Sequence, residues 1–205
     1  MKIQILEKND KEIKFVLEES NPQFANALRR IMLSEIPIMA VDTIDFHSND
    51  SVLYNEVIAH RLGLIPLVFN PKDFNLREEC TCGGKGCSLC QVVFALDKKG
   101  PSMVYSKDLK SSNKEVKPLY DNIPIVELFE GQKLKLEAYA ILGFAKKYAK
   151  WQAAKASYNY DSKNGSKFTF VVESISGLSP EQIVLIASDV LKSKAKEFEK
   201  EIAKL

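Results

Sequence analysis

Alternation of apolar and polar residues predicts strands in several parts of the chain. Residues 2–8 and 12–18 alternate on either side of the turn-forming pair Asn9-Asp10, and together they predict a β-hairpin. Further strands are predicted where alternation or β-branched residues recur, over residues 38–49, 91–97, 102–108, 134–140 and 167–175. Residues 152–166 are polar and turn-forming.

Apolar residues at helical spacing predict three helices. The first begins at Asn21, an N-cap candidate, has Pro22 in its first position and ends at about Glu35. Its apolar face comprises Phe24, Ala27, Leu28 and Ile31. A second, short helix is predicted over residues 54–62.

The third helix has the most regular pattern and lies at the end of the sequence. Ser179 is its N-cap candidate, followed by Pro180 and Glu181 in the first turn. Its apolar stripe comprises Ile183, Ile186, Ala187, Val190, Leu191, Phe198, Ile202 and Leu205. Such a helix would be about 38 Å long, which is more than a domain of about 80 residues can cover. We therefore expect its outer turns to be buried against another subunit.

This mixture of elements predicts an α+β fold. Strands occur near both ends of the sequence, and the middle carries most of the loop-rich material. We expect one sheet domain built from both chain ends, with a second, mainly β domain inserted between them.

Composition narrows the class of protein. Hydrophobic residues make up 45% of the 205 residues, which is enough for a folded core. The 29 Lys and Arg residues nearly balance the 27 Asp and Glu residues, and a net charge of +2 lacks the basic excess of proteins that bind duplex DNA. No apolar run reaches the ~18 residues of a membrane-spanning helix, and the charged start differs from a secretory signal. We expect an intracellular, cytoplasmic protein with no membrane contact and no direct sequence-specific DNA contact.

All four cysteines lie in one glycine-rich loop, CTCGGKGCSLC, at positions 80–90. In a reducing compartment such a set is typical of a metal site rather than of disulfides. Four thiolates can surround one tetrahedral zinc ion, and the glycines let the backbone fold tightly around it. The spacing differs from the ferredoxin pattern, so an iron–sulfur cluster is a weaker alternative, beside an empty loop or disulfides. We predict one structural zinc, bound by Cys80, Cys82, Cys87 and Cys90.

Three groups of polar residues have both a functional and a plainer interpretation. Arg29 and Arg30 could contact a partner or phosphate, or lie on a solvated helix surface. The lysines around Trp151 could bind nucleic acid, or belong to a charged loop that the tryptophan anchors. His47 and His60 lack a second ligand type at useful spacing and are interpreted as surface or core residues. No phosphate-binding, dinucleotide-binding, zinc-protease or serine-hydrolase motif occurs, so the chain is predicted to have no catalytic residues of its own.

Several stretches, in order along most of the chain, resemble one family. They are NALRRIMLSEIPIMAVDTIDF, NEVIAHRLGLIPL, the cysteine loop with QVVFALD and VYSKDL, and IPIVELFEGQKLKLEAYAILG with AKW. Together they resemble the assembly-platform subunits of cellular RNA polymerases, which include the bacterial alpha subunit, the archaeal D subunit and the third-largest subunit of eukaryotic RNA polymerase II. The archaeal D subunits are the most similar. Some of them carry a ferredoxin-like domain after AKW, for which the short segment between Trp151 and Lys167 leaves no room.

The resemblance implies a dimerisation domain over residues 1–41 and 167–205 and an inserted domain over residues 42–166. It implies a non-catalytic role in DNA-directed RNA polymerase, a nucleotidyltransferase. The subunit would pair with a smaller homologous subunit, called L in archaea, and recruit the largest and second-largest catalytic subunits, with small zinc-containing subunits alongside. Arg29 and Arg30 are expected to face a large catalytic subunit. Dimerisation is expected through Phe24, Leu28, Ile31, Val190, Phe198, Ile202 and Leu205.

Two other functions fit the same residues. One is a free-standing zinc-containing regulatory or nucleic-acid-binding protein, which would be monomeric or homodimeric by itself. The other is an electron-carrying iron–sulfur protein, which visible absorbance would reveal. Dependence on a partner subunit distinguishes the polymerase interpretation from both.

Overall fold

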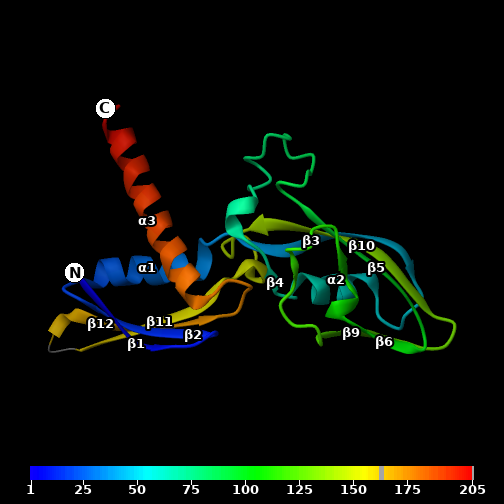
Figure 1. Ribbon diagram of the computed structural model, residues 1–205. Coiled ribbons are helices and arrows are strands. Elements are labelled where there is room, and N and C mark those ends of the chain that lie inside the picture. Colours follow the sequence, from blue (N-terminus) through cyan, green and yellow to red (C-terminus); the bar gives the residue numbers. More distant parts are fainter. Residues whose placement is uncertain (162–163, 205) are drawn as a thin grey trace. The chain divides into compact units, whose positions relative to one another are not determined.

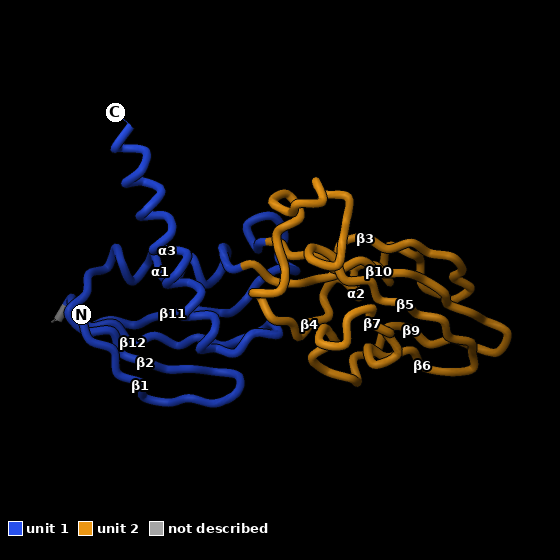
Figure 2. The backbone as a smooth tube through the Cα atoms, turned by 45° about the horizontal axis from the view of Figure 1, so that its top comes forward, with its two compact units in different colours: residues 1–36, 144–205 blue, residues 37–143 orange. Residues whose placement is uncertain are grey.

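The computed structural model describes residues 1–161 and 164–204, and the chain folds into two compact units (Figures 1 and 2). Unit 1 contains residues 1–36 and 144–205, and unit 2 contains residues 37–143. Both units combine antiparallel strands with helices, which confirms the predicted α+β class.

The sheet of unit 1 joins segments from both ends of the chain. Its strand order is β1-β2-β12-β11, and all neighbouring strands are antiparallel. The strands are β1 Lys2–Lys8, β2 Glu12–Glu18, β11 Ala154–Asp161 and β12 Asn164–Ser174. The predicted hairpin of β1 and β2 is confirmed, since the Asn9 side chain accepts hydrogen bonds from the backbone N–H groups of Lys11 and Glu12.

Two helices of unit 1 pack against this sheet. At the start of α1 (Pro22–Ser34), Asn21 Oδ1 accepts a hydrogen bond from the Phe24 N–H at 2.8 Å, as predicted for an N-cap. Helix α3 (Pro180–Ile202) starts with a capping box, in which the side chains of Ser179 and Gln182 each accept from the other residue's backbone N–H. Helix α1 contacts β11 and β12, and α3 contacts β2, β12 and α1.

Aromatic side chains form the centre of the unit 1 core. The rings of Phe15 on β2 and Phe170 on β12 stack with their centroids 5.0 Å apart. Tyr158 on β11 contacts Phe170 and also Phe168, whose ring meets the tyrosine edge-on at 5.6 Å. The pairing of β2 with β12 therefore also joins the two ends of the chain through their side chains.

Strand β11 lies in a segment that was predicted to be polar and turn-forming, so that prediction is wrong for residues 154–161. Ala154 and Ala156 are buried at alternate positions of the strand, while Lys155 is exposed. Because alanine is small and only weakly apolar, this alternation is difficult to recognise from the sequence.

The boundaries of the units differ from those expected at residues 41 and 166. The inserted unit begins at Pro37 because β3 (Ile38–Asn49) pairs along its length with β10 (Lys133–Gly143). It ends at Gly143, where that pairing ends, and residues 144–166 belong to unit 1 because β11 pairs with β12.

Unit 2 is built on a four-stranded antiparallel sheet with the order β3-β10-β5-β7. Helix α2 (Asn55–Gly63) contacts β3 and β9. Strands β5 and β7 complete this sheet, and the remaining strands of the unit form two short ladders, β4–β8 and β6–β9. Their bounds are β4 Leu67–Val68, β5 Val92–Lys99, β6 Ser102–Tyr105, β7 Lys110–Ser111, β8 Lys117–Pro118 and β9 Pro124–Leu128. Unit 2 also contains the short 3-10 helices η1 Pro71–Asp73 and η2 Ser106–Asp108, and unit 1 contains η3 Ala149–Trp151.

The strand predicted over residues 102–108 is shorter than expected. Strand β6 ends at Tyr105, and the chain then turns through η2. The Asp108 carboxylate accepts a hydrogen bond from the Tyr105 N–H at 2.8 Å, which stabilises the turn over the extended chain.

Candidate metal centre and subunit-contact surfaces

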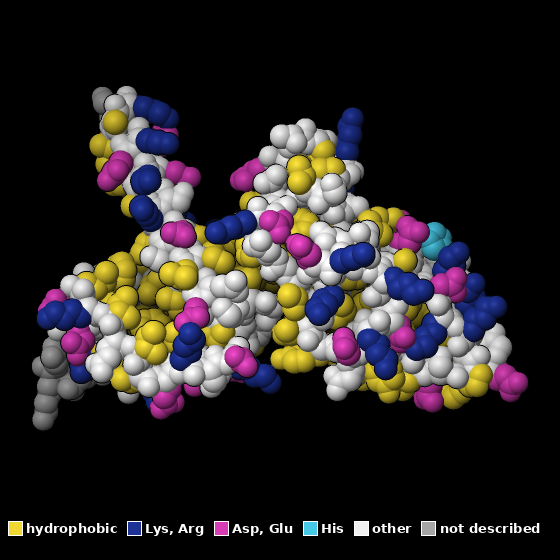
Figure 3. All heavy atoms as spheres, in the orientation of Figure 1, with side chains coloured by type: hydrophobic (Ala, Val, Ile, Leu, Met, Phe, Trp, Pro, Cys, Tyr) yellow, Lys and Arg dark blue, Asp and Glu magenta, His cyan; other side chains and the backbone are white. Residues whose placement is uncertain are grey.

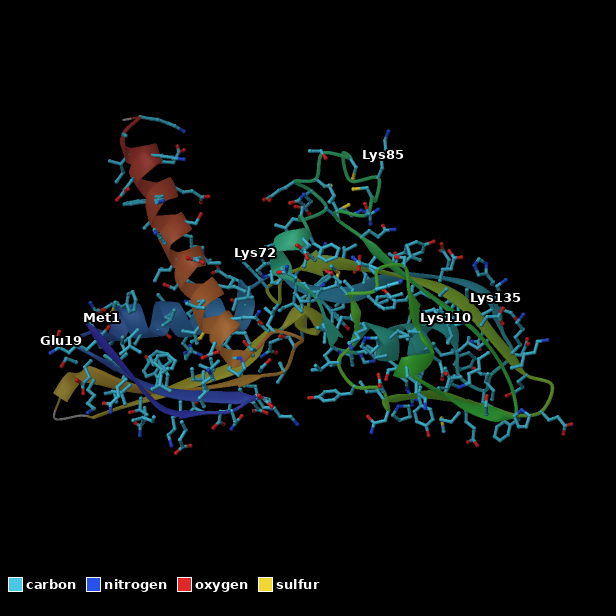
Figure 4. The ribbon with its side chains drawn as sticks, in the orientation of Figure 1. Met1, Glu19, Lys72, Lys85, Lys110 and Lys135 are labelled. Atoms are coloured by element: carbon cyan, nitrogen blue, oxygen red, sulfur yellow. The ribbon has the colours of Figure 1, made fainter. Side chains whose placement is uncertain are left out.

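The four cysteines belong to one closed loop of unit 2, between η1 and β5. Its base is closed by a hydrogen bond from the Asn75 N–H to the Leu89 carbonyl at 2.8 Å. Figure 4 shows sulfur atoms gathered in this loop, which also carries the labelled Lys85. The fold of the loop therefore brings together the side chains that the sequence predicts as metal ligands.

The four sulfur atoms have the spacing of ligands around a single ion. The Sγ atoms of Cys80 and Cys87 are 3.5 Å apart, and those of Cys82 and Cys90 are 3.6 Å apart. Cys87 Sγ lies 3.8 Å from Cys90 Sγ, and all four sulfurs lie within 4.8 Å of one another. A tetrahedron with Zn–S bonds of ~2.3 Å has sulfurs about 3.8 Å apart, so the observed spacings fit one such ion.

Backbone N–H groups donate to the sulfurs and affect their protonation. The Gly86 N–H donates to the Cys82 sulfur, and this bond lowers the pKa of the Cys82 thiol to about 6. The Cys87 N–H donates to Cys90 Sγ at 3.3 Å, but burial outweighs that bond and raises the pKa of the Cys90 thiol to about 12. Metal ligation requires thiolates. Cys82, with its lowered pKa, loses its proton readily, whereas the buried Cys90 needs the charge of a metal ion to lose its proton.

The donor set suits one soft divalent ion rather than a cluster. A [4Fe–4S] cube carries its cysteines on four separate iron atoms, which requires sulfurs farther apart than around one ion. Gly83, Gly84 and Gly86 have φ angles of +63°, +78° and +90°, so the loop uses their freedom to close around the sulfurs. Four cysteine ligands complete a tetrahedron, so an ion held here has no position for substrate.

Helix α3 exposes apolar side chains in its outer turns. Figure 1 shows the helix extending beyond the sheet of its own unit. Its buried residues are Pro180, Ile183 and Ala187. Val190 is half-buried, whereas Phe198 is 67% exposed and Ile202 is 52% exposed. The predicted contact residue Leu205 lies outside the described residues.

An apolar groove beside α3 was not found by sequence reasoning. We refer to it as the β1–α3 groove; it is lined by Ile3, Ile5, Ile13, Phe15, Val184 and Leu185, together with Glu181. Ile3, Ile5 and Leu185 are more than half exposed. Figure 3 shows hydrophobic side chains gathered on unit 1 below α3. Alternation identified the two faces of β1, but it does not reveal that β1 is the edge strand and exposes all seven of its residues.

The predicted contact residues on α1 have unequal exposure. Leu28 is 6% exposed and Ile31 is 4% exposed, so both belong to the core of unit 1 and leave little surface for a partner. Phe24 is half-buried. Arg29 is also half-buried and donates from Nη2 to Asn26 Oδ1 at 3.0 Å, whereas Arg30 is exposed.

The other polar candidates of the sequence occupy ordinary structural positions. Trp151 is 2% exposed, and Lys150 Nζ lies 4.4 Å from its ring centroid, which favours a charged loop anchored by the tryptophan. His47 is exposed with Nε2 3.8 Å from Glu137 Oε1, and His60 is exposed on α2. In the described part of the chain, only the four cysteines bring His, Cys, Asp or Glu side chains close enough to hold a metal, so neither histidine belongs to such a group.

Comparisons with known proteins show the family to which the chain belongs. The family described as RNA polymerase Rpb3/RpoA insert domain matches residues 36–161. A DNA-directed RNA polymerase subunit Rpo3 from Archaeoglobus fulgidus is 49% identical over 150 residues, which cover 73% of this chain. Proteins of the same name from Methanosarcina mazei and Pyrococcus furiosus are 46% and 47% identical over 76% and 78% of this chain. The chain belongs to the family of RNA polymerase subunits that contain the Rpb3/RpoA insert domain.

The similarity covers only part of those relatives. The matched regions span 57% of the Archaeoglobus protein and 59% of each of the other two. Among the helices of the described residues, none is both long enough and apolar enough to cross a membrane.

Proposed function

We propose that the chain is a non-catalytic assembly-platform subunit of DNA-directed RNA polymerase. Membership of the Rpb3/RpoA family supports this function. The single structural observation that carries it is the exposure of Phe198 and Ile202 on a helix whose inner turns are buried. Large apolar side chains gathered on one surface are typical of a protein contact.

In this proposal the first partner is the smaller homologous subunit, called L in archaea. The outer turns of α3 contact that subunit through Phe198 and Ile202, with Phe24 and Val190 at the edge of the surface. Burial of each large apolar side chain contributes about 1.5–3 kcal/mol. If the partner has the same fold, its own helix can enter the β1–α3 groove, because two similar subunits related by an approximate two-fold axis exchange equivalent contacts.

The resulting pair recruits the two large catalytic subunits, which carry out RNA synthesis. Arg29 and Arg30 are proposed to contact the second-largest subunit, since guanidinium groups pair well with carboxylates at interfaces. Small zinc-containing subunits dock alongside. The chain itself contributes no catalytic group and no sequence-specific contact with DNA.

The cysteine loop is proposed to hold one structural zinc ion through its four thiolates. The sulfur spacings of 3.5, 3.6 and 3.8 Å and the all-cysteine donor set support zinc over an iron–sulfur cluster. A bound ion contributes folding free energy to a loop that has little regular structure of its own. The zinc therefore serves to keep the loop rigid.

Co-expression with an archaeal subunit L tests this function. We expect a 1:1 heterodimer by native mass spectrometry, and recruitment of the largest and second-largest subunits to that heterodimer in a reconstitution assay. A chain that stays monomeric or homodimeric beside free subunit L would contradict the proposal. That outcome would support a free-standing zinc protein, which the polymerase relatives do not favour.

A further inference from the structure

Arg77 connects the segment before the first cysteine to the middle of the cysteine loop. Its half-buried side chain donates from Nε to the Gly84 carbonyl at 2.9 Å. The residue precedes Cys80 in the sequence, and its contact lies between Cys82 and Cys87. One side chain thus spans the part of the loop that carries the first two ligands, Cys80 and Cys82.

The turn that Arg77 contacts is closed by a long backbone hydrogen bond. Gly83 and Gly84 both have positive φ, and the turn they form is closed by a bond from the Lys85 N–H to the Cys82 carbonyl of 3.4 Å. Backbone N–H to carbonyl bonds are usually about 2.9–3.0 Å long. Two consecutive glycines also give the unfolded chain the greatest backbone freedom, so this turn needs support from outside.

The position of the turn determines the position of a ligand. Cys82 is the first residue of the turn, and its carbonyl accepts the closing bond from the Lys85 N–H. A displaced turn would therefore move Cys82 relative to the other ligands, of which Cys90 Sγ lies 3.6 Å from Cys82 Sγ. Within the described residues, Arg77 is the one side chain outside the cysteine set with a hydrogen bond to residues 82–86.

We propose that Arg77 is a positioning residue of the metal centre, which holds the Cys82–Lys85 turn in place and so slows release of the ion. This inference rests on the proposed zinc site. The guanidinium is permanently charged, and four thiolates around Zn²⁺ carry a net negative charge, so its charge is also favourable near the loop. Residues of this kind, which orient ligands without touching the metal, commonly change metal affinity about 10–100-fold.

Three substitutions separate the hydrogen bond from the charge. Arg77→Met removes both, and Arg77→Lys keeps the charge but loses the Nε donor. Lys85→Met removes a positive charge from the same loop and serves as the control, because Lys85 is exposed and Figure 4 shows its side chain pointing away from the loop. The backbone bond from Asn75 to Leu89 does not involve these side chains, so the base of the loop stays closed in every variant.

The experiment measures the rate of zinc release from the purified full chain to a metallochromic chelator. We expect Arg77→Met to release zinc about tenfold faster than the wild type or more, Arg77→Lys to lie between them, and Lys85→Met to match the wild type. Amide exchange should accelerate at residues 83–86 in Arg77→Met and remain unchanged in β5, which distinguishes a loosened turn from an unfolded unit.

Two results would overturn the role of Arg77. One is a release rate for Arg77→Met equal to that of the wild type, and the other is an equal acceleration in Lys85→Met, which would assign the effect to charge alone. A wild-type chain purified without zinc would instead contradict the proposed metal centre, and this inference would fail with it.

Discussion

Lys98 Nζ lies 2.6 Å from Asp108 Oδ2 and links strand β5 to the turn after β6. The same carboxylate oxygen accepts the Tyr105 N–H, and Lys98 also donates to the Met103 carbonyl at 3.0 Å. Both charged side chains are largely shielded from solvent, with 26% and 21% of their surfaces exposed. This pair therefore fixes a turn that replaces the strand expected from the sequence.

The Lys98–Asp108 pair predicts a stability that depends on pH. Burial acts to raise the pKa of Asp108, but the bonds from Lys98 and the Tyr105 N–H outweigh it, and the pKa is lowered. The stabilisation is therefore present above the unfolded-state pKa of about 3.9 and is lost as the pH falls through the lower folded-state value. Asp108→Asn should lower the free energy of unfolding by about 1–3 kcal/mol at pH 7.

Urea unfolding of the wild type and Asp108→Asn between pH 3 and pH 7 measures this effect. The difference in the free energy of unfolding between the wild type and Asp108→Asn should become smaller toward pH 3. Asp97→Asn is the matched control, because Asp97 pairs with Lys133 at 3.4 Å but is 53% exposed, so its loss should change stability by less than about 1 kcal/mol. A pH-independent difference for Asp108→Asn would show that the charge of the carboxylate is not responsible.

Replacing one cysteine should affect the loop and spare unit 1. Cys87 Sγ has close neighbours in Cys80 and Cys90, so Cys87→Ser removes one corner of the ligand set. We expect one zinc per chain in the wild type, much less in the variant, and faster amide exchange in residues 75–91 only, because the ion contributes the folding free energy of the loop. Elemental analysis that finds iron in the wild type, or full zinc in Cys87→Ser, would be incompatible with this account.

The metal-free loop should contain one unusually reactive thiol. With its pKa lowered to about 6, Cys82 is a thiolate at pH 7, and its reactivity should fall as the pH drops below about 6. Cys90, with its pKa raised to about 12 by burial, should react slowly over the same range. Iodoacetamide labelling after chelation, followed by peptide mass spectrometry from pH 5 to pH 8, measures both sites. Faster labelling of Cys90 than of Cys82 would refute this order.

Removing the two arginines of α1 should separate the two stages of assembly. Arg29→Ala combined with Arg30→Ala should leave the pair with subunit L intact, because both arginines lie on α1 and the proposed contact with subunit L is made by the outer turns of α3. The affinity of that pair for the second-largest subunit should fall at least tenfold, or about 1.4 kcal/mol. Lys155→Ala with Lys167→Ala removes two other positive charges of unit 1 and should have no such effect. Unchanged binding in the arginine variant would mean that both residues lie on a solvated surface.

Local signals predicted much of this structure. The caps at Asn21 and Ser179 act through side-chain bonds to neighbouring backbone groups, so the sequence contains all the information needed to recognise them. The cysteine centre was predictable for a similar reason, since a short loop can bring its ligands together only around one point. The sequence does not show how Arg77 contributes, because its contact depends on the conformation of two glycines.

Features that depend on contacts between distant parts of the chain were not predicted from the sequence. The alanines of β11 alternate too weakly to indicate a strand, and the burial of that strand depends on α1. Ile3 and Ile5 have the alternation of a buried strand face, yet they are exposed because β1 is at the edge of the sheet. In the same way, Leu28 and Phe198 share the helical pattern of a contact surface, but only the fold shows that the first is a core residue and the second is exposed.

The affinity of a variant for subunit L measures whether the outer turns of α3 bind a smaller polymerase subunit. Phe198→Ala with Ile202→Ala removes the exposed apolar side chains. Lys196→Ala with Lys200→Ala is the control, because it shortens two exposed polar side chains on the opposite side of the same turns. Isothermal titration calorimetry should give a dissociation constant for the first variant that is weaker on the order of a hundredfold or more. The control should bind like the wild type. Equal affinity of wild type and Phe198→Ala/Ile202→Ala would contradict the proposed platform function of this helix.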